Sequence, residues 1–160
     1  MHIIQPTDLS HLFIALRGRG YAVVAPMLRD GAIVLDVVSS VDQLPRGVTD
    51  VQSPAEYGTA RRTDEAFFGY AVGPHSWKKF LLPPVTQLFS LTKVGKGFDV
   101  SRTNGSAPEK YAFVGVRPCE LSAIGLHDRV FREGPYVNES YSGARRETFI
   151  VAVNCAEPRG

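Results

Sequence analysis

Apolar residues recur at helical spacing near the start of the chain. Four of them follow the i, i+3, i+4, i+7 spacing of one buried helix face: Leu9, Leu12, Phe13 and Leu16. Thr7 precedes this run and is a candidate N-cap, because its hydroxyl can accept a hydrogen bond from a free amide of the first turn. Gly18 and Gly20 end the predicted helix.

Two apolar runs, residues 21–27 and 32–38, predict a pair of β-strands. Asp30-Gly31 lies between them, and this dipeptide between apolar runs is typical of a hairpin turn. Residues 39–54 carry proline, glycine, aspartate and serine with weak periodicity, so we expect a connecting loop there.

The middle of the chain alternates short polar and aromatic stretches. Residues 61–70 begin polar and end in aromatic residues, which predicts a strand. Residues 77–82 can form a short helix, and the two prolines at 83 and 84 block its continuation. Residues 88–94 alternate weakly and form a strand candidate, whereas residues 95–108 carry the glycines, asparagine and proline of turns and loop.

The last fifty residues show the clearest pattern. Residues 111–116 and 148–153 are short β-rich apolar runs, and a helical stretch from about Glu120 to Phe131 separates them. A separation this long favours a parallel strand–helix–strand crossover. We therefore predict one α/β domain over residues 1–160, with α+β as the alternative. Its mixed sheet carries an N-terminal helix and hairpin and a C-terminal βαβ unit.

Composition narrows the class of protein. The 160 residues are 44% apolar and 21% charged with a formal charge of +2, which is typical of a globular domain and leaves no basic patch for nucleic acid. We expect neither a nucleic-acid partner nor a membrane span, since no window approaches 18 consecutive apolar residues. Two cysteines do not form a disulfide framework, so we expect a cytoplasmic protein with reduced thiols.

The positions of those two cysteines suggest chemistry. Cys119 follows the strand predicted at 111–116 and Cys155 follows the strand predicted at 148–153, so parallel strands would bring both to the carboxyl edge of the sheet, where ligands bind. Cys119 also comes at the predicted helix start, after Arg117 and Pro118, and a helix N-terminus lowers the pKa of a thiol. A lone free cysteine is more often a small buried hydrophobe, but two cysteines at equivalent positions after neighbouring strands give the two interpretations about equal weight.

The remaining candidate ligands are explained without metal binding. His11, His75 and His127 lack metal-ligand spacing, and we expect His127 to be a partly exposed helix residue. The loop around His75 carries Trp77, Lys78 and Lys79, which either dock an anion or a partner or belong to a simple turn. We expect Asp64-Glu65 to be a solvated strand entry and not a general acid and base. We expect surface charge at Arg61-Arg62 and Arg145-Arg146, with an anion-binding role for each pair as the alternative.

Three segments in order resemble a known family. They are residues 62–84 (RTDEAFFGYAVGPHSWKKFLLPP), 115–121 (GVRPCEL) and 153–155 (VNC). They resemble the iron–sulfur subunit shared by sulfhydrogenases, as the beta subunit, and anaerobic sulfite reductases, as the A subunit. Glu120 stands where the family usually has aspartate, which keeps the negative charge.

The resemblance implies an electron-transfer subunit that carries 4Fe–4S clusters within a multi-subunit redox complex. It implies that Cys119 and Cys155 are cluster ligands, with Arg117 and Pro118 beside the cofactor. Two thiolates cannot hold a four-iron cluster, which needs four ligands. The family's further cysteines lie beyond the equivalent of residue 160, so we expect this chain to be the N-terminal part of a longer protein that is not catalytic alone.

Two other functions stay open from the residues. One is a scaffold or interaction domain without a redox role, which packs its aromatic surfaces against other subunits. A thiol enzyme with Cys119 as the nucleophile is the weaker of the two.

Overall fold

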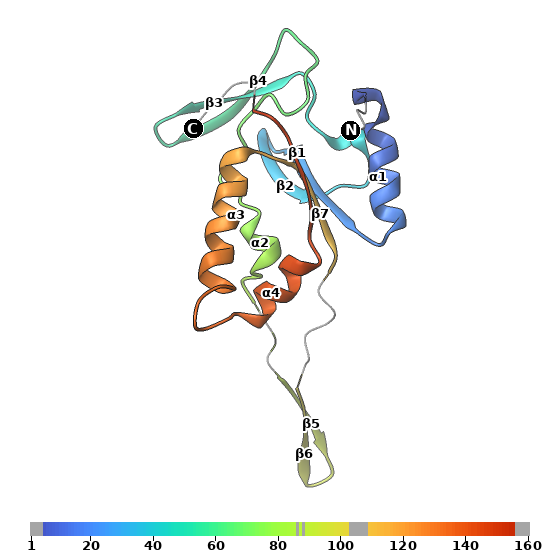
Figure 1. Cartoon of the computed structure of the whole chain (residues 1–160), viewed down its shortest axis with the longest axis vertical. Helices are drawn as coiled ribbons and strands as arrows, with labels where there is room; N and C mark the ends of the chain where they lie inside the picture. Colours follow the sequence, from blue (N-terminus) through green and yellow to red (C-terminus); the bar gives the residue numbers. More distant parts are fainter. Residues whose placement is uncertain (1–4, 86, 88, 103–108, 156–160) are drawn as a thin grey trace.

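A four-stranded mixed sheet lies at the centre of the computed structural model, which describes residues 5–85, 87, 89–102 and 109–155 (Figure 1). The strand order is β2-β1-β7-β8, with bounds Ala32–Val37, Ala22–Arg29, Tyr111–Val116 and Phe149–Ala152. β1 pairs antiparallel with β2 and parallel with β7, and β7 pairs parallel with β8. The predicted mixed α/β fold and the parallel βαβ unit are therefore confirmed.

The N-terminal helix and hairpin also form as the sequence predicts. A 3₁₀ turn, η1 (Pro6–Asp8), leads into α1 (Leu9–Gly18), which buries Phe13 and Leu16. The N-cap position of α1 is Asp8, so the capping role predicted for Thr7 is wrong; Thr7 lies inside the 3₁₀ turn. Asp30 and Gly31 both take positive φ, 50° and 75°, which is the geometry of a tight hairpin turn between β1 and β2.

Helices cover the two faces of the sheet unequally (Figure 1). On one face α1 packs against alternate strand residues in a core cluster of Phe13, Leu16, Val23, Ala25, Val38, Leu44, Ala112 and Val114. On the other face lie α2 (Lys78–Leu81), α3 (Pro118–Phe131) and α4 (Glu139–Arg146). The core there consists of Val24, Leu35, Trp77, Leu81, Phe113, Val116, Ile124 and Tyr141.

Two separate hairpins extend from this body. β3 (Val48–Ser53) pairs with β4 (Glu56–Arg61), and β5 (Phe89–Val94) pairs with β6 (Gly97–Arg102). The loop predicted for residues 39–54 is therefore wrong in part, since it contains a 3₁₀ turn, η2 (Val41–Gln43), and β3. β6 and α4 were not expected either, and part of the loop predicted at 95–108 lies outside the described residues.

The strand predicted at 61–70 does not form. β4 ends at Arg61, and residues 62–73 form a loop. An isolated β-bridge joins Phe67 of this loop to Arg46. The aromatic residues that suggested a strand pack inward from irregular backbone; Phe68 has φ 60° and Tyr70 is buried. Aromatic residues favour strands through burial on a sheet, and here a loop provides that burial.

The short helix predicted near 77–82 is confirmed as α2. None of the helices in the described part of the chain has the length and apolar character required to cross a bilayer.

Candidate functional site

The carboxyl ends of β7 and β8 bring the two cysteine segments to one edge of the sheet. β7 leads through Arg117 into α3, and β8 leads through Val153 and Asn154 to Cys155. The Val153 amide donates to the Val116 carbonyl at 2.9 Å, which continues the strand contact to this edge. Cys119 and Cys155 are both exposed there, so the interpretation of either as a small buried hydrophobe does not hold.

Cys119 lies in the first turn of α3. The helix begins at Pro118, two residues before the start predicted at Glu120, with extended backbone at the N-cap Arg117. The Glu120 carboxylate accepts a hydrogen bond from the Arg117 amide at 2.8 Å, and the Leu121 amide donates to the Arg117 carbonyl at 2.9 Å. These bonds fix the backbone on both sides of Cys119 while its side chain faces outward.

Arg117 and Glu120 form a shielded pair beneath the cysteine. Their side chains are 14% and 15% exposed, and Arg117 Nε lies 3.7 Å from Glu120 Oε2. Arg117 Nε is buried and has no hydrogen-bond partner among the described residues. Pro118 is exposed and supplies the fixed φ that suits the first position of a helix.

A β-bulge at Gly115 sets how the chain leaves β7. The register shifts between Val114 and Val116, and Gly115 has φ 94°. A Cβ at Gly115 would lie 2.5 Å from Cε1 of Phe68, so glycine is required both for the backbone and for the space. The bulge also turns Val116 to the face opposite Val114, as their membership of different core clusters shows.

The loop that delivers Phe68 to the bulge is held by an arginine fork. Arg62 Nε and Nη2 donate to the two carboxylate oxygens of Asp64 at 2.7 and 2.8 Å, and Nη1 donates to the Gly69 carbonyl at 3.2 Å. The hydrogen bond from Arg62 lowers the pKa of Asp64 to about 2, and the Ala66 amide acts in the same direction. Arg62 is thus a structural residue with a 16% exposed side chain, which corrects its prediction as surface charge.

Buried polar groups lie under the same end of the sheet. Asp50, 4% exposed on β3, accepts from the Ala71 amide at 2.6 Å, and the Tyr57 hydroxyl donates to the Ala71 carbonyl at 2.8 Å. The Tyr70 hydroxyl is buried without a hydrogen-bond partner among the described residues, and burial raises the pKa of Tyr70 strongly, with Tyr57 and Glu120 adding to the effect. Sequence reasoning missed Asp50 because β3 was not predicted.

The other predicted pairs and histidines stay apart from the cysteine edge. Arg145 Nε donates to Asp128 at 3.2 Å, and His11 lies 3.8 Å from Asp8. His127 is partly buried on α3, as predicted.

In the loop around His75, Trp77 and Lys79 have structural roles. Trp77 is buried and its ring centroid lies 4.8 Å from that of Phe113. Lys79 donates to the Leu35 carbonyl at 2.6 Å and lies 3.4 Å from Nδ1 of His75. Burial and the nearby Lys79 lower the pKa of His75. Lys78 and Lys79 are both exposed on α2.

The described residues alone do not fit a complete metal centre. No group of three or more His, Cys, Asp or Glu side chains in residues 5–85, 87, 89–102 and 109–155 is arranged to hold an ion. The cysteine edge offers two thiols, whereas a four-iron cluster needs four ligands.

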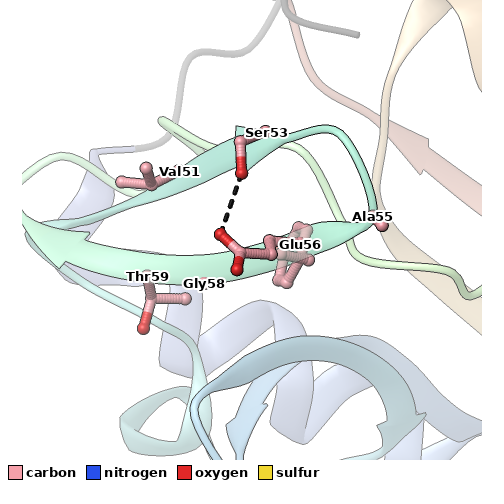
Figure 2. A pocket seen from close by; sticks show the side chains of 7 residues that line it. Val51, Ser53, Ala55, Glu56, Gly58 and Thr59 are labelled. Carbon is pink, nitrogen blue, oxygen red and sulfur yellow. Dashed lines mark hydrogen bonds between the residues drawn. The ribbon is translucent and has the colours of Figure 1, made fainter.

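A shallow hollow on the β3–β4 hairpin shows a different surface (Figure 2). Ser53 and Glu56 lie across its strands, and the Ser53 hydroxyl donates to the Glu56 carboxylate at 3.0 Å. The hollow gathers none of the cysteine or arginine side chains discussed above, so we assign it no chemistry.

The fold and the edge together define an α/β domain with two exposed thiols at the carboxyl ends of adjacent parallel strands. No protein-family model, curated protein or solved structure matches the chain.

Proposed function

We propose that this chain is a ligand-bearing domain of an iron–sulfur electron-transfer subunit, in a redox complex of the hydrogenase or sulfite-reductase type. The observation that carries the proposal is the placement of Cys119 and Cys155 after two hydrogen-bonded parallel strands. Because both thiols are exposed at one edge, they are open to a shared metal centre. The resemblance of the three sequence segments supports the same function.

The chain supplies two thiolate ligands in this proposal, and cysteines other than the two in this sequence complete the set. Its own contribution is rigidity, because the bulge at Gly115 and the bonds around Arg117 fix the backbone that carries Cys119. A ligand on fixed backbone loses little freedom when metal binds. The exposure of both thiols also leaves room for a partner subunit, and a reducing compartment such as the cytoplasm keeps such thiols available.

Cobalt(II) tests whether the two thiols share one ion. Thiolate-to-cobalt charge transfer gives an absorption band whose intensity follows the number of thiolates bound. We expect the band in the wild-type chain under anaerobic conditions. Cys119→Ser and Cys155→Ser should each weaken both the band and the affinity, while Ala123→Ser, an exposed change one turn further along α3, should leave them unchanged.

Iron then tests the cluster itself. We expect the protein extended with downstream cysteines to hold iron and labile sulfide after anaerobic reconstitution, and each Cys→Ser change to reduce both. Unchanged cluster content in both serine variants would contradict the proposal.

A scaffold domain without redox chemistry is the second candidate. The observation that favours it is the apolar surface on the outer side of α3, where Leu126 and Val130 are about 60% exposed. Exposed apolar patches often mark protein interfaces. Loss of partner binding in Leu126→Ser, with no metal bound by the wild-type protein, would favour this function over the first.

A further inference from the structure

The β5–β6 hairpin stands apart from the rest of the molecule as a two-stranded arm (Figure 1). Four of its large apolar side chains are more than half exposed: Phe89, Leu91, Phe98 and Val100. An isolated two-stranded hairpin is marginally stable in water, and a hydrophobic face on it gains stability when another surface covers it.

The register places these four side chains on one face of the arm. Leu91 pairs with Val100 and Lys93 pairs with Phe98, while Phe89 lies two residues before Leu91 on the same strand. Cross-strand partners share a face and successive residues alternate between faces. We define the apolar hairpin face as Phe89, Leu91, Lys93, Phe98 and Val100.

The opposite face of the arm is polar apart from Val94, which is 62% exposed beside the turn. Ser90 pairs with Ser101, with their hydroxyl oxygens 2.6 Å apart, and Thr92 pairs with Asp99. The arm is therefore amphipathic, and its apolar face is the one that lacks a cover.

We infer that the apolar hairpin face is covered by the same face of a second copy of this chain, so that the protein associates as a two-fold dimer. A two-fold interface brings the same patch together from both copies, so the patch must complement itself. Two orientations of a two-fold axis lying within the interface have to be considered, one across the strands and one along them.

In both orientations Lys93 lies over an aromatic residue of the second copy. With the axis across the strands, Lys93 lies over Phe89 of the second copy and Leu91 meets its counterpart; with the axis along the strands, Lys93 lies over Phe98 and Leu91 meets Val100. Neither orientation sets Lys93 against itself. An ammonium group over an aromatic ring is attractive, so the Lys93 charge adds to the fit.

The size of the face sets the expected strength. Side chains of this kind expose on the order of 400 Å² together at the observed exposure, which gives about 800 Å² for two copies. Specific interfaces usually bury about 1,200 Å² or more, so we expect a weak, concentration-dependent dimer.

A lipid surface fits the arm less well. Basic clusters that bind anionic membranes have about four to eight lysines or arginines. The described charged side chains of the hairpin are Lys93, Lys96 and Asp99, which fall short of such a cluster.

Sedimentation velocity over a range of protein concentrations tests the dimer, with two lysine variants of neighbouring residues. Leu91→Lys places a charge on the apolar hairpin face, and Thr92→Lys places the same charge on the polar face, opposite Asp99. We expect Leu91→Lys to weaken self-association by about tenfold or more, which corresponds to about 1.4 kcal/mol, and Thr92→Lys to leave it unchanged.

Cross-linking keeps the test valid if Leu91→Lys disturbs the arm. In a Cys119→Ser, Cys155→Ser background, we expect oxidation to join two copies through Leu91→Cys if the axis crosses the strands. The axis along the strands instead joins a Leu91→Cys chain to a Val100→Cys chain when the two single variants are mixed, and Thr92→Cys should join none.

Three outcomes would overturn the inference. They are a monomer at every concentration, equal effects of the two lysine variants, and a monomer that sediments with phosphatidylserine-containing vesicles through Leu91. The last outcome would assign the face to a membrane surface.

Discussion

At the scale of single residues, Gly115 has the largest influence on the cysteine edge. Its positive φ and the Phe68 ring against its α-carbon create the bulge that precedes Arg117 and Cys119. Without the extra residue, the alternation of β7 would direct Val116 toward α1 instead of toward α3. The glycine therefore decides which core the last residue of β7 joins.

Gly115→Ala should destabilise the protein by about 2–4 kcal/mol, because alanine is strained at φ 94° and its Cβ would collide with Phe68. Urea unfolding followed by circular dichroism measures the difference. Gly125→Ala on α3 is the matched control, since nothing lies within 4 Å of the added Cβ. We expect the control to be neutral or stabilising by about 0.5–1 kcal/mol. Equal stability of both variants would show that the bulge is not constrained.

Some of the site residues could be predicted from their neighbours in sequence. Cys119 and Cys155 follow apolar runs, so a parallel βαβ unit alone was enough to place both at one edge. Asp50 and Phe68 could not be predicted, because their roles depend on contacts with Ala71 and Gly115 that are distant in sequence. The one available signal was the glycine within the apolar run 111–116, which interrupts a strand.

At the scale of elements, the loop of residues 62–73 shows why periodicity alone misleads. Its aromatic residues suggested a strand, yet the Arg62 fork on Asp64 and Gly69 closes the chain into a loop that inserts Phe68. α4 was missed for a related reason. Its sequence contains serines and a glycine that form helices poorly, and it is stabilised by the Asn138 cap and the burial of Tyr141.

Asp64→Asn should destabilise the protein at neutral pH, with the difference from wild type disappearing in acid. The pKa of Asp64 is about 2 in the folded protein against 3.8 ordinarily. Because the folded value is the lower one, the stabilisation is fully present above about pH 4 and is lost as the pH falls towards 2. Unfolding measured at several pH values checks this.

The matched variant for this element is Arg62→Lys, which keeps the charge and loses the fork. We expect it to be less stable than wild type at neutral pH, since lysine cannot bind both carboxylate oxygens of Asp64 and the Gly69 carbonyl together. The Asp64 carboxylate is exposed, so the Asp64→Asn effect should shrink in high salt. A difference that persists unchanged at pH 2 would contradict the role of the Asp64 charge.

At the scale of the whole molecule, the structure combines a well-packed body with an arm that adds little to it. β7 lies between β1 and β8 and buries nearly all of its side chains between the two helical faces. β5 and β6 instead leave their apolar side chains open. The sequence shows apolar residues in both segments. Their burial differs because helices cover both faces of β7, whereas neither face of the β5–β6 hairpin is covered by another described element.

This contrast predicts two levels of stability in hydrogen exchange. Amides of residues 112–114 in β7 should exchange through global unfolding, and those of the β5–β6 hairpin should exchange at least about a hundredfold faster through local opening. Mass spectrometry of exchanged peptides at low protein concentration measures both. Raising the concentration should slow exchange in the hairpin alone, because dimer formation stabilises the closed arm by mass action. Hairpin protection equal to that of β7 at low concentration would instead show that the arm unfolds together with the body.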